Sequence, residues 1–259
     1  MFYEFLSNLL SDKTGDLIFT RFGPWHFIYM LIIFGGTIAT ILLVKNKSDK
    51  VKQKVINTTV AIAFGLYMAD FFLMPFAYGR IDIDKLPFHA CTSMCLMSFF
   101  SRHSKSLSKY TLSFALIGLI SNLIYTVYPD GVASYGIHPL SYRAVQTLMF
   151  HGVMTAYGIF TLTLDSTVKL EWKKCYRELV LLVILAAWAI TGNTLYTGTL
   201  GDYSHDFNWF FVKRDPFGML PESISQYVMP FVTVFCFFAM TLIIRAIYFG
   251  VKKLMKSKK

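Results

Sequence analysis

Seven apolar stretches, several of them about as long as a helix that crosses a bilayer, constrain the fold of this 259-residue chain more than any other feature. A transmembrane helix needs about 20 consecutive, predominantly apolar residues. The composition agrees, because 55% of the residues are hydrophobic, only 15% are charged and the mean hydropathy is +0.50. A soluble domain carries roughly 25% charged residues. We therefore predict an all-α, polytopic membrane protein, a bundle of seven transmembrane helices.

The predicted spans form one transmembrane domain from residue 25 to residue 249. They are expected at residues 25–44, 55–78, 86–101, 110–128, 144–164, 178–198 and 226–249. An external N-terminal segment (1–24) precedes the domain and a basic cytoplasmic tail (250–259) follows it. Apolar residues recur at helical spacing in the N-terminal segment, which is typical of a short amphipathic helix in the membrane interface. Its acidic residues are unlike the basic start of a cleavable signal peptide.

Lysine and arginine alternate between the two sides of the predicted bundle. Most of the 25 basic residues fall in the loops after the first, third and fifth spans and in the tail. Because such residues stay preferentially on the cytoplasmic side, we predict an external N-terminus and a cytoplasmic C-terminus in the plasma membrane. The net charge of +10 is split into short clusters between apolar runs. It therefore indicates anionic lipid head groups as partners and no nucleic acid; protein partners are not indicated.

Polar side chains fall at a similar depth in five of the predicted spans. With a rise of 1.5 Å per residue, one polar residue in each of these spans lies roughly 8 to 12 Å below the outer end of its helix. These are Asp70, Cys91, Asn122, His151 and Asn193. Ionisable groups inside a span are costly and usually face the bundle interior or a cavity. We therefore predict a polar cavity in the outer half of the membrane, which His89 and Cys95 also line.

Cys91 is the candidate nucleophile of this layer, since a thiolate forms more readily beside a histidine. His89 lies about 200° around the same predicted helix, so His151 from another helix is the better candidate for a general base. Asn122 or Asn193 would orient the imidazole or donate to an oxyanion. A structural reading stays open, because cysteines in apolar helices often only pack and asparagines often only join helices.

The cysteines indicate neither a disulfide framework nor a metal site. Cys175 lies in a basic loop, and the other three, Cys91, Cys95 and Cys236, lie in apolar runs. No second closely spaced pair completes a zinc site. Asp202, His205 and Asp206 share an external loop, but ligand type alone does not make a metal site. We predict no metal and no cofactor.

The run Leu86-Pro-Phe-His-Ala-Cys91 resembles the Leu-Pro-x-His-x-Cys motif of the YwaF-like bacterial membrane proteins, which are related to the eukaryotic transmembrane protein 164. Further matches extend the similarity over most of the chain: Phe150-His-Gly152, Gly192-Asn-Thr-Leu-Tyr196, Asn208-Trp-Phe and Lys213-Arg-Asp-Pro216. The eukaryotic relatives are acyltransferases that move a fatty acyl chain between phospholipids through a membrane-embedded cysteine. The resemblance implies a bacterial protein in which Cys91 takes the role of that cysteine and His151 that of the histidine.

Three functions remain open. The first is cysteine-dependent acyl transfer or hydrolysis on a membrane lipid near the outer leaflet, with Cys91 as nucleophile and His151 as base. The second is a transporter or ligand-binding protein that holds a small ligand or ion in the polar layer, although transporters are usually built from repeats and none is evident here. The third is a structural subunit of a larger membrane complex. The shared depth of the polar groups favours the first.

Overall fold

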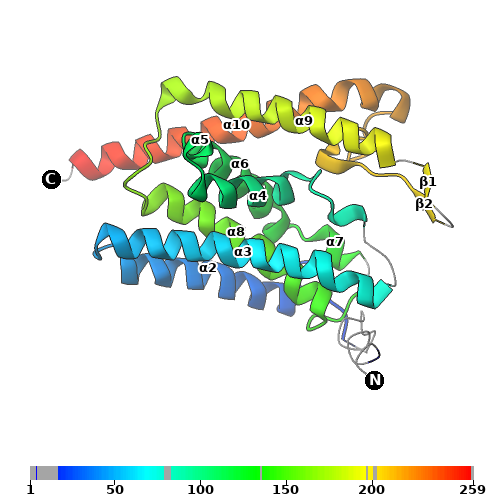
Figure 1. The fold of residues 1–259 in the computed structure, drawn as a ribbon, viewed down its shortest axis with the longest axis horizontal. Coiled ribbons are helices and arrows are strands. Elements are labelled where there is room, and N and C mark those ends of the chain that lie inside the picture. Colours follow the sequence, from blue (N-terminus) through cyan, green and yellow to red (C-terminus); the bar gives the residue numbers. More distant parts are fainter. Residues whose placement is uncertain are drawn as a thin grey trace.

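The computed structural model describes residues 4, 17–78, 83–134, 136–196, 198–200 and 203–257, so most of the predicted N-terminal amphipathic segment lies outside the described residues. Its long helices run side by side (Figure 1). They are α2 (Pro24–Val44), α3 (Asp49–Tyr78), α4 (Ala90–His103), α6 (Thr111–Val127), α8 (Tyr142–Thr163), α9 (Tyr176–Tyr196) and α10 (Glu222–Ser257). The connections contain the single turns η1 (Ile83–Lys85), α5 (Lys105–Ser108), α7 (Asp130–Ala133), η2 (Trp172–Lys174) and η3 (Trp209–Phe211).

A short hairpin follows α9 where the sixth predicted span was expected to continue. Strands β1 (Gly198–Leu200) and β2 (Tyr203–His205) are antiparallel, with Thr199 opposite Ser204. The helix ends at Tyr196. At the other end of the chain, α10 continues to Ser257, so the basic tail begins as part of the last helix.

Among the described residues, five helical segments are long and apolar enough to cross a membrane, which agrees with a helical, polytopic membrane protein. They are Pro24–Val44, Asp49–Phe76, Thr111–Ala133, Trp172–Tyr196 and Glu222–Leu254. The two remaining predicted spans correspond to α4 and α8. Helix α4 has 14 residues and therefore measures only about 21 Å. Helix α8 has 22 residues, but many of its buried residues are polar.

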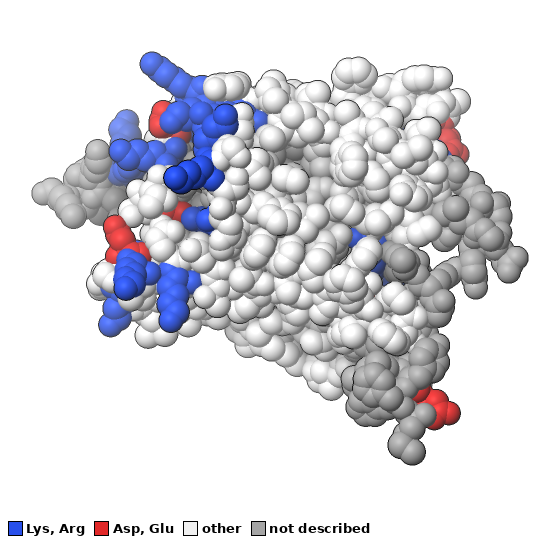
Figure 2. All heavy atoms as spheres, in the orientation of Figure 1, with Lys and Arg blue, Asp and Glu red and all other residues white. Residues whose placement is uncertain are grey.

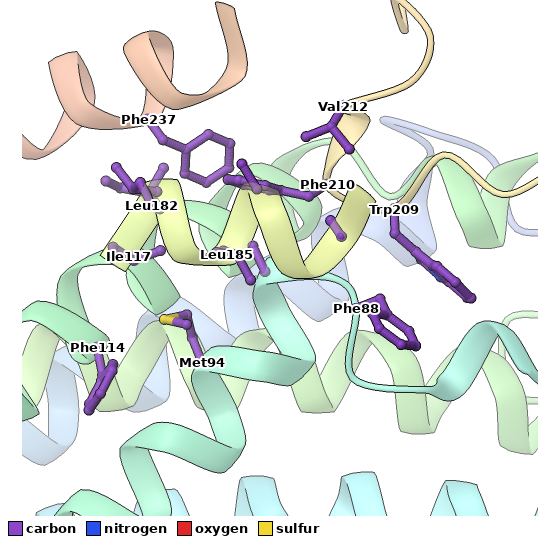
Figure 3. Packing of buried hydrophobic residues seen from close by; sticks show 14 residues of the cluster. Phe88, Met94, Phe114, Ile117, Leu182, Leu185, Trp209, Phe210, Val212 and Phe237 are labelled. Atoms are coloured by element: carbon purple, nitrogen blue, oxygen red, sulfur yellow. The ribbon is translucent and has the colours of Figure 1, made fainter. Parts of the chain in front are cut away.

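Helices α4 and α6 lie between two groups of helices, α2, α3 and α8 on one side and α9 and α10 on the other (Figure 1). One apolar cluster joins α6, α9, α10 and η3, with Phe237 close to Leu182 and Phe210 (Figure 3). A second cluster joins α3, α4, α6 and α8. Met94 belongs to the first cluster and its neighbour Cys95 to the second. Helix α4 thus ties the two halves together.

The outer helices expose large apolar side chains. Leu31 on α2 is 74% exposed and Phe231 on α10 is 77% exposed. Exposed apolar surface on this scale is unusual for a soluble monomer and is what a lipid-facing surface requires. The more polar helices α4 and α8 lie inside, where neighbouring helices shield them from lipid.

Basic residues gather at the end of the bundle that carries the C-terminus and the α2–α3 connection (Figure 2). Arg245 of α10 is only 1% exposed and pairs with the equally buried Glu178 of α9 at 2.5 Å. Arg102 is likewise buried and pairs with Asp165 at 2.6 Å. Each of these two arginines pairs with a carboxylate from a distant part of the chain, Glu178 in α9 or Asp165 after α8, which charge counting alone does not reveal.

Candidate functional site

His151 of α8 and Asn122 of α6 meet in the interior of the bundle. Asn122 is completely buried and His151 nearly so, and 2.8 Å separates His151 Nδ1 from Asn122 Oδ1. The Asn122 amide Nδ2 donates to the Gly118 carbonyl at 2.7 Å, which fixes the orientation of the amide. Since Oδ1 can only accept, His151 Nδ1 carries the proton and Nε2 keeps its lone pair. The asparagine thus selects the tautomer in which Nε2 is the basic nitrogen.

Tyr125, which the sequence analysis did not single out, holds the other face of this imidazole. Its ring stacks on His151 with 3.8 Å between centroids and 17° between planes. A Cβ at Gly131 of α7 would lie 2.7 Å from the Tyr125 hydroxyl, so the glycine leaves room for the phenol. Tyr125 follows Asn122 by three residues, and this spacing, which places both on one helix face, was the available signal.

Cys91 is half-buried at the second position of α4, beside the second apolar cluster. As the second residue of the helix, Cys91 lies in the first turn, where backbone N–H groups have no intrahelical partners. Within the described part of the chain, no hydrogen bond joins Cys91 to His151.

The residues before Cys91 are not helical, which departs from the predicted start of the third span at residue 86. Helix α4 begins at Ala90 with His89 as its extended N-cap. The Pro87 carbonyl accepts from the side chains of Trp188 at 2.7 Å and Ser93 at 2.6 Å instead of a helix N–H. The estimate that His89 lies about 200° around the helix from Cys91 therefore does not apply.

Three of the motifs that carry the family resemblance converge on Phe88. Its ring stacks between Trp188 and Trp209, at 4.7 Å from each centroid, and lies beside Trp209 in the close-up view (Figure 3). A Cβ at Gly192 would lie 2.4 Å from the Phe88 ring. The glycine thus lets α9 approach the segment that leads into Cys91.

Replacing Gly192 by alanine is expected to destabilise the protein by about 1–3 kcal/mol, because Phe88 is held on both faces and cannot yield to an added methyl group. Thermal unfolding in detergent micelles measures this effect. Gly65→Ala in α3 is the matched control, since nothing lies within 4 Å of the added carbon. Equal unfolding temperatures for the two variants would show that Phe88 has room to move.

Asn193 lies away from His151 and fastens the external loop. Its Oδ1 accepts from the Trp209 backbone N–H at 2.9 Å and its Nδ2 donates to the Trp209 carbonyl at 3.2 Å. Asn208 braces the same loop by accepting from the backbone of Lys213 and Arg214 at 3.0 and 2.9 Å. Both polar atoms of Asn193 are thus occupied by the backbone of the loop.

Asp84 connects His89 to this loop. The His89 Nε2 lies 3.7 Å from Asp84 Oδ1, which also accepts from the Trp209 indole at 3.1 Å. Desolvation acts to raise the pKa of Asp84, but the neighbouring His89 and Lys85 and the indole N–H lower this pKa to about 2. Asp84 therefore stays ionised at neutral pH and connects the loop to the start of α4.

Asp70 pairs with Lys85, not with His151. Its Oδ2 lies 2.9 Å from Lys85 Nζ, and the carboxylate is almost fully buried. Its Oδ1 and the hydroxyl of Tyr142 are buried and have no hydrogen-bond partner among the described residues. Cys95 is fully buried in the second apolar cluster. Of the predicted layer, His151 and Asn122 are thus in direct contact, whereas Asp70 pairs with Lys85 and Asn193 binds the Trp209 backbone.

The fold and the buried polar groups define a polytopic helical membrane protein in which Asn122 and His151 meet inside the bundle. The model of the TMEM164 family matches residues 21–249, and the chain belongs to this family. Searches of curated proteins and of solved structures returned no match.

Proposed function

We propose that this protein is a membrane-embedded acyltransferase that carries an acyl group on Cys91. In this proposal it belongs to the bacterial, YwaF-like branch of the family and crosses the plasma membrane seven times, with the N-terminus outside and the C-terminus inside. Helices α4 and α8 complete the seven spans between the five apolar ones. The basic cluster at the end that carries the C-terminus supports this orientation, and it would contact anionic lipid head groups.

The observation that carries the proposal is the defined tautomer of His151, whose Nε2 is free to take a proton. In the first step the Cys91 sulfur attacks the carbonyl carbon of a lipid ester. The thiol proton passes to His151 and then to the leaving alkoxide, so that a thioester and a free lipid hydroxyl result. In the second step an acceptor hydroxyl, or water in hydrolysis, gives its proton to His151 and attacks the thioester, which restores the thiol.

The oxyanion that forms in each step needs hydrogen-bond donors. Asn122 and Asn193 direct their amide donors to carbonyl groups of the protein. Cys91 and Thr92 lie in the first turn of α4, whose backbone N–H groups have no intrahelical acceptors. In the proposed mechanism these backbone groups stabilise the oxyanion, Asn122 positions the base and Asn193 positions the loop.

Lipid analysis of cells tests the proposed reaction. A strain that lacks the protein is complemented with wild type, Cys91→Ala or Cys236→Ala, and the acyl chains of its phospholipids and lipoproteins are compared. We expect Cys91→Ala to match the deletion strain and Cys236→Ala, which removes an exposed thiol on α10, to match wild type. Restoration of the wild-type profile by Cys91→Ala would refute the proposal.

A second candidate function is the binding of a small polar ligand or ion, which the unpartnered Asp70 Oδ1 and Tyr142 hydroxyl favour. Buried polar atoms without partners are rare and often mark a bound water or ion. This function predicts that Asp70→Asn abolishes activity in cells while Cys91→Ser leaves it intact. The acyltransferase proposal predicts the opposite, namely that Cys91→Ser lowers activity in cells more than Asp70→Asn does.

A further inference from the structure

At the end of the bundle opposite the basic cluster, the C-terminal end of α9 lies near the N-terminal end of α10 (Figure 1). Residues of these two ends and of the loop between them line a crevice. Its volume is about 370 Å³, which lies in the range of small-molecule sites. It is lined by side chains of α9, of the loop after β2 and of α10: Ile190, Asn193, Thr194, Val212, Lys213 and Gln226. The lining thus combines apolar walls with polar and cationic groups.

Two cations of the loop beside the crevice share one carboxylate, while the loop's other carboxylate, Asp215, accepts from three backbone N–H groups. Lys213 and Arg214 both pair with the single carboxylate of Asp206, Arg214 at 2.8 Å. An ammonium group has three donors, so Lys213 keeps donors beyond the one that Asp206 takes. Asn208 fixes the backbone of both basic residues, and Ser225 of α10 donates to the Lys213 carbonyl. The cation is therefore held at the crevice by the fold of the loop.

The helix surfaces around the crevice are apolar and exposed. Leu195 on α9 is 69% exposed, and Tyr227 and Phe231 on α10 are 70% and 77% exposed. In a membrane such surfaces contact acyl chains. A ligand that matches both features has an anionic head for Lys213 and long apolar chains for the two helices.

We propose that this crevice binds the phosphate head group of a membrane phospholipid. Asn193 lines the crevice and holds Trp209, whose indole contacts Asp84 beside His89. The head group would therefore lie next to the Trp209 loop, which contacts the segment that leads into Cys91. Binding of the lipid in this crevice is independent of the proposed reaction. Only its role as the acyl donor rests on that reaction.

Photo-crosslinking of the full chain in phosphatidylcholine vesicles tests the site. The probe is phosphatidylglycerol with a diazirine in the head group, used in the Cys91→Ser background, and labelled peptides are mapped by mass spectrometry. We expect labelling at residues 190–194 and 226, reduced about five-fold by Lys213→Gln and retained in Lys213→Arg. Asp206 keeps its partner Arg214 in both variants, so the loop stays charge-paired.

Two controls separate the outcomes. Lys252→Gln removes a lysine near the C-terminal end of α10 and should leave the labelling unchanged, whereas Thr194→Trp fills the crevice and should abolish it. Labelling that survives both Lys213→Gln and Thr194→Trp would overturn the inference. Equal competition by glycerophosphoglycerol would show a site for soluble anions and would also overturn it. Neither result bears on acyl transfer to Cys91, which is tested separately.

Discussion

Replacing Asn122 by leucine is expected to lower the rate of acyl transfer through Cys91 by roughly 10²-fold or more, with KM little changed. Leucine fills a similar volume in this fully buried position, but it cannot accept from His151 Nδ1. The imidazole then loses the partner that selects its tautomer, and Nε2 is no longer reserved for the thiol proton. Steady-state kinetics with a soluble thioester acyl donor measure the change.

Asn57→Leu is the matched control for this prediction. Asn57 lies on the exposed face of α3, so the same substitution there removes no interior contact. Both variants should unfold at temperatures close to that of wild type if the asparagine acts through the histidine. A wild-type rate for Asn122→Leu would mean that His151 is not the base.

Replacing Glu178 by glutamine is expected to destabilise the protein by about 3–5 kcal/mol, the largest stability effect that we predict. The substitution leaves the Arg245 guanidinium charged and only 1% exposed. Glu178 also accepts from Ser113 of α6 at 2.5 Å, and Arg245 donates to the Glu171 carbonyl at 2.7 Å. The pair therefore holds α6, α9 and α10 together, and thermal unfolding in detergent should show its loss.

Two further variants distinguish an uncompensated charge from lost packing. The double variant Glu178→Leu with Arg245→Met removes both charges and should recover much of the lost stability. Glu171→Gln breaks the exposed pair with Lys174 and should leave the unfolding temperature unchanged. If Glu178→Gln unfolded at the wild-type temperature, the Arg245 charge would have to find another partner.

Depth along a helix can be predicted from sequence, whereas rotation about the helix axis cannot. The rise per residue placed Asn122, His151 and Asn193 in one layer. In the fold, Asn122 faces His151 and Asn193 faces the Trp209 loop. The difference arises because packing against neighbouring helices decides which way each face points.

The start of α4 and the role of Arg245 could not be predicted, for a related reason. A proline at residue 87 is typical of a first helical turn, but its carbonyl accepts from Trp188, a residue distant in the sequence. The buried pairing of Arg245 cannot be predicted from its own helix, because its partner Glu178 belongs to another one. In both cases a contact over long sequence separation overrides the local pattern.

Mass spectrometry of the purified protein after reaction with an acyl-donor lipid probe tests the acyltransferase proposal most directly. We predict one acyl adduct on Cys91 that is absent in Cys91→Ala and weakened in His151→Ala. The other three cysteines serve as internal controls, because all four are free thiols. A folded wild-type protein without an adduct on Cys91, or with equal labelling of Cys236, would contradict Cys91 as the nucleophile.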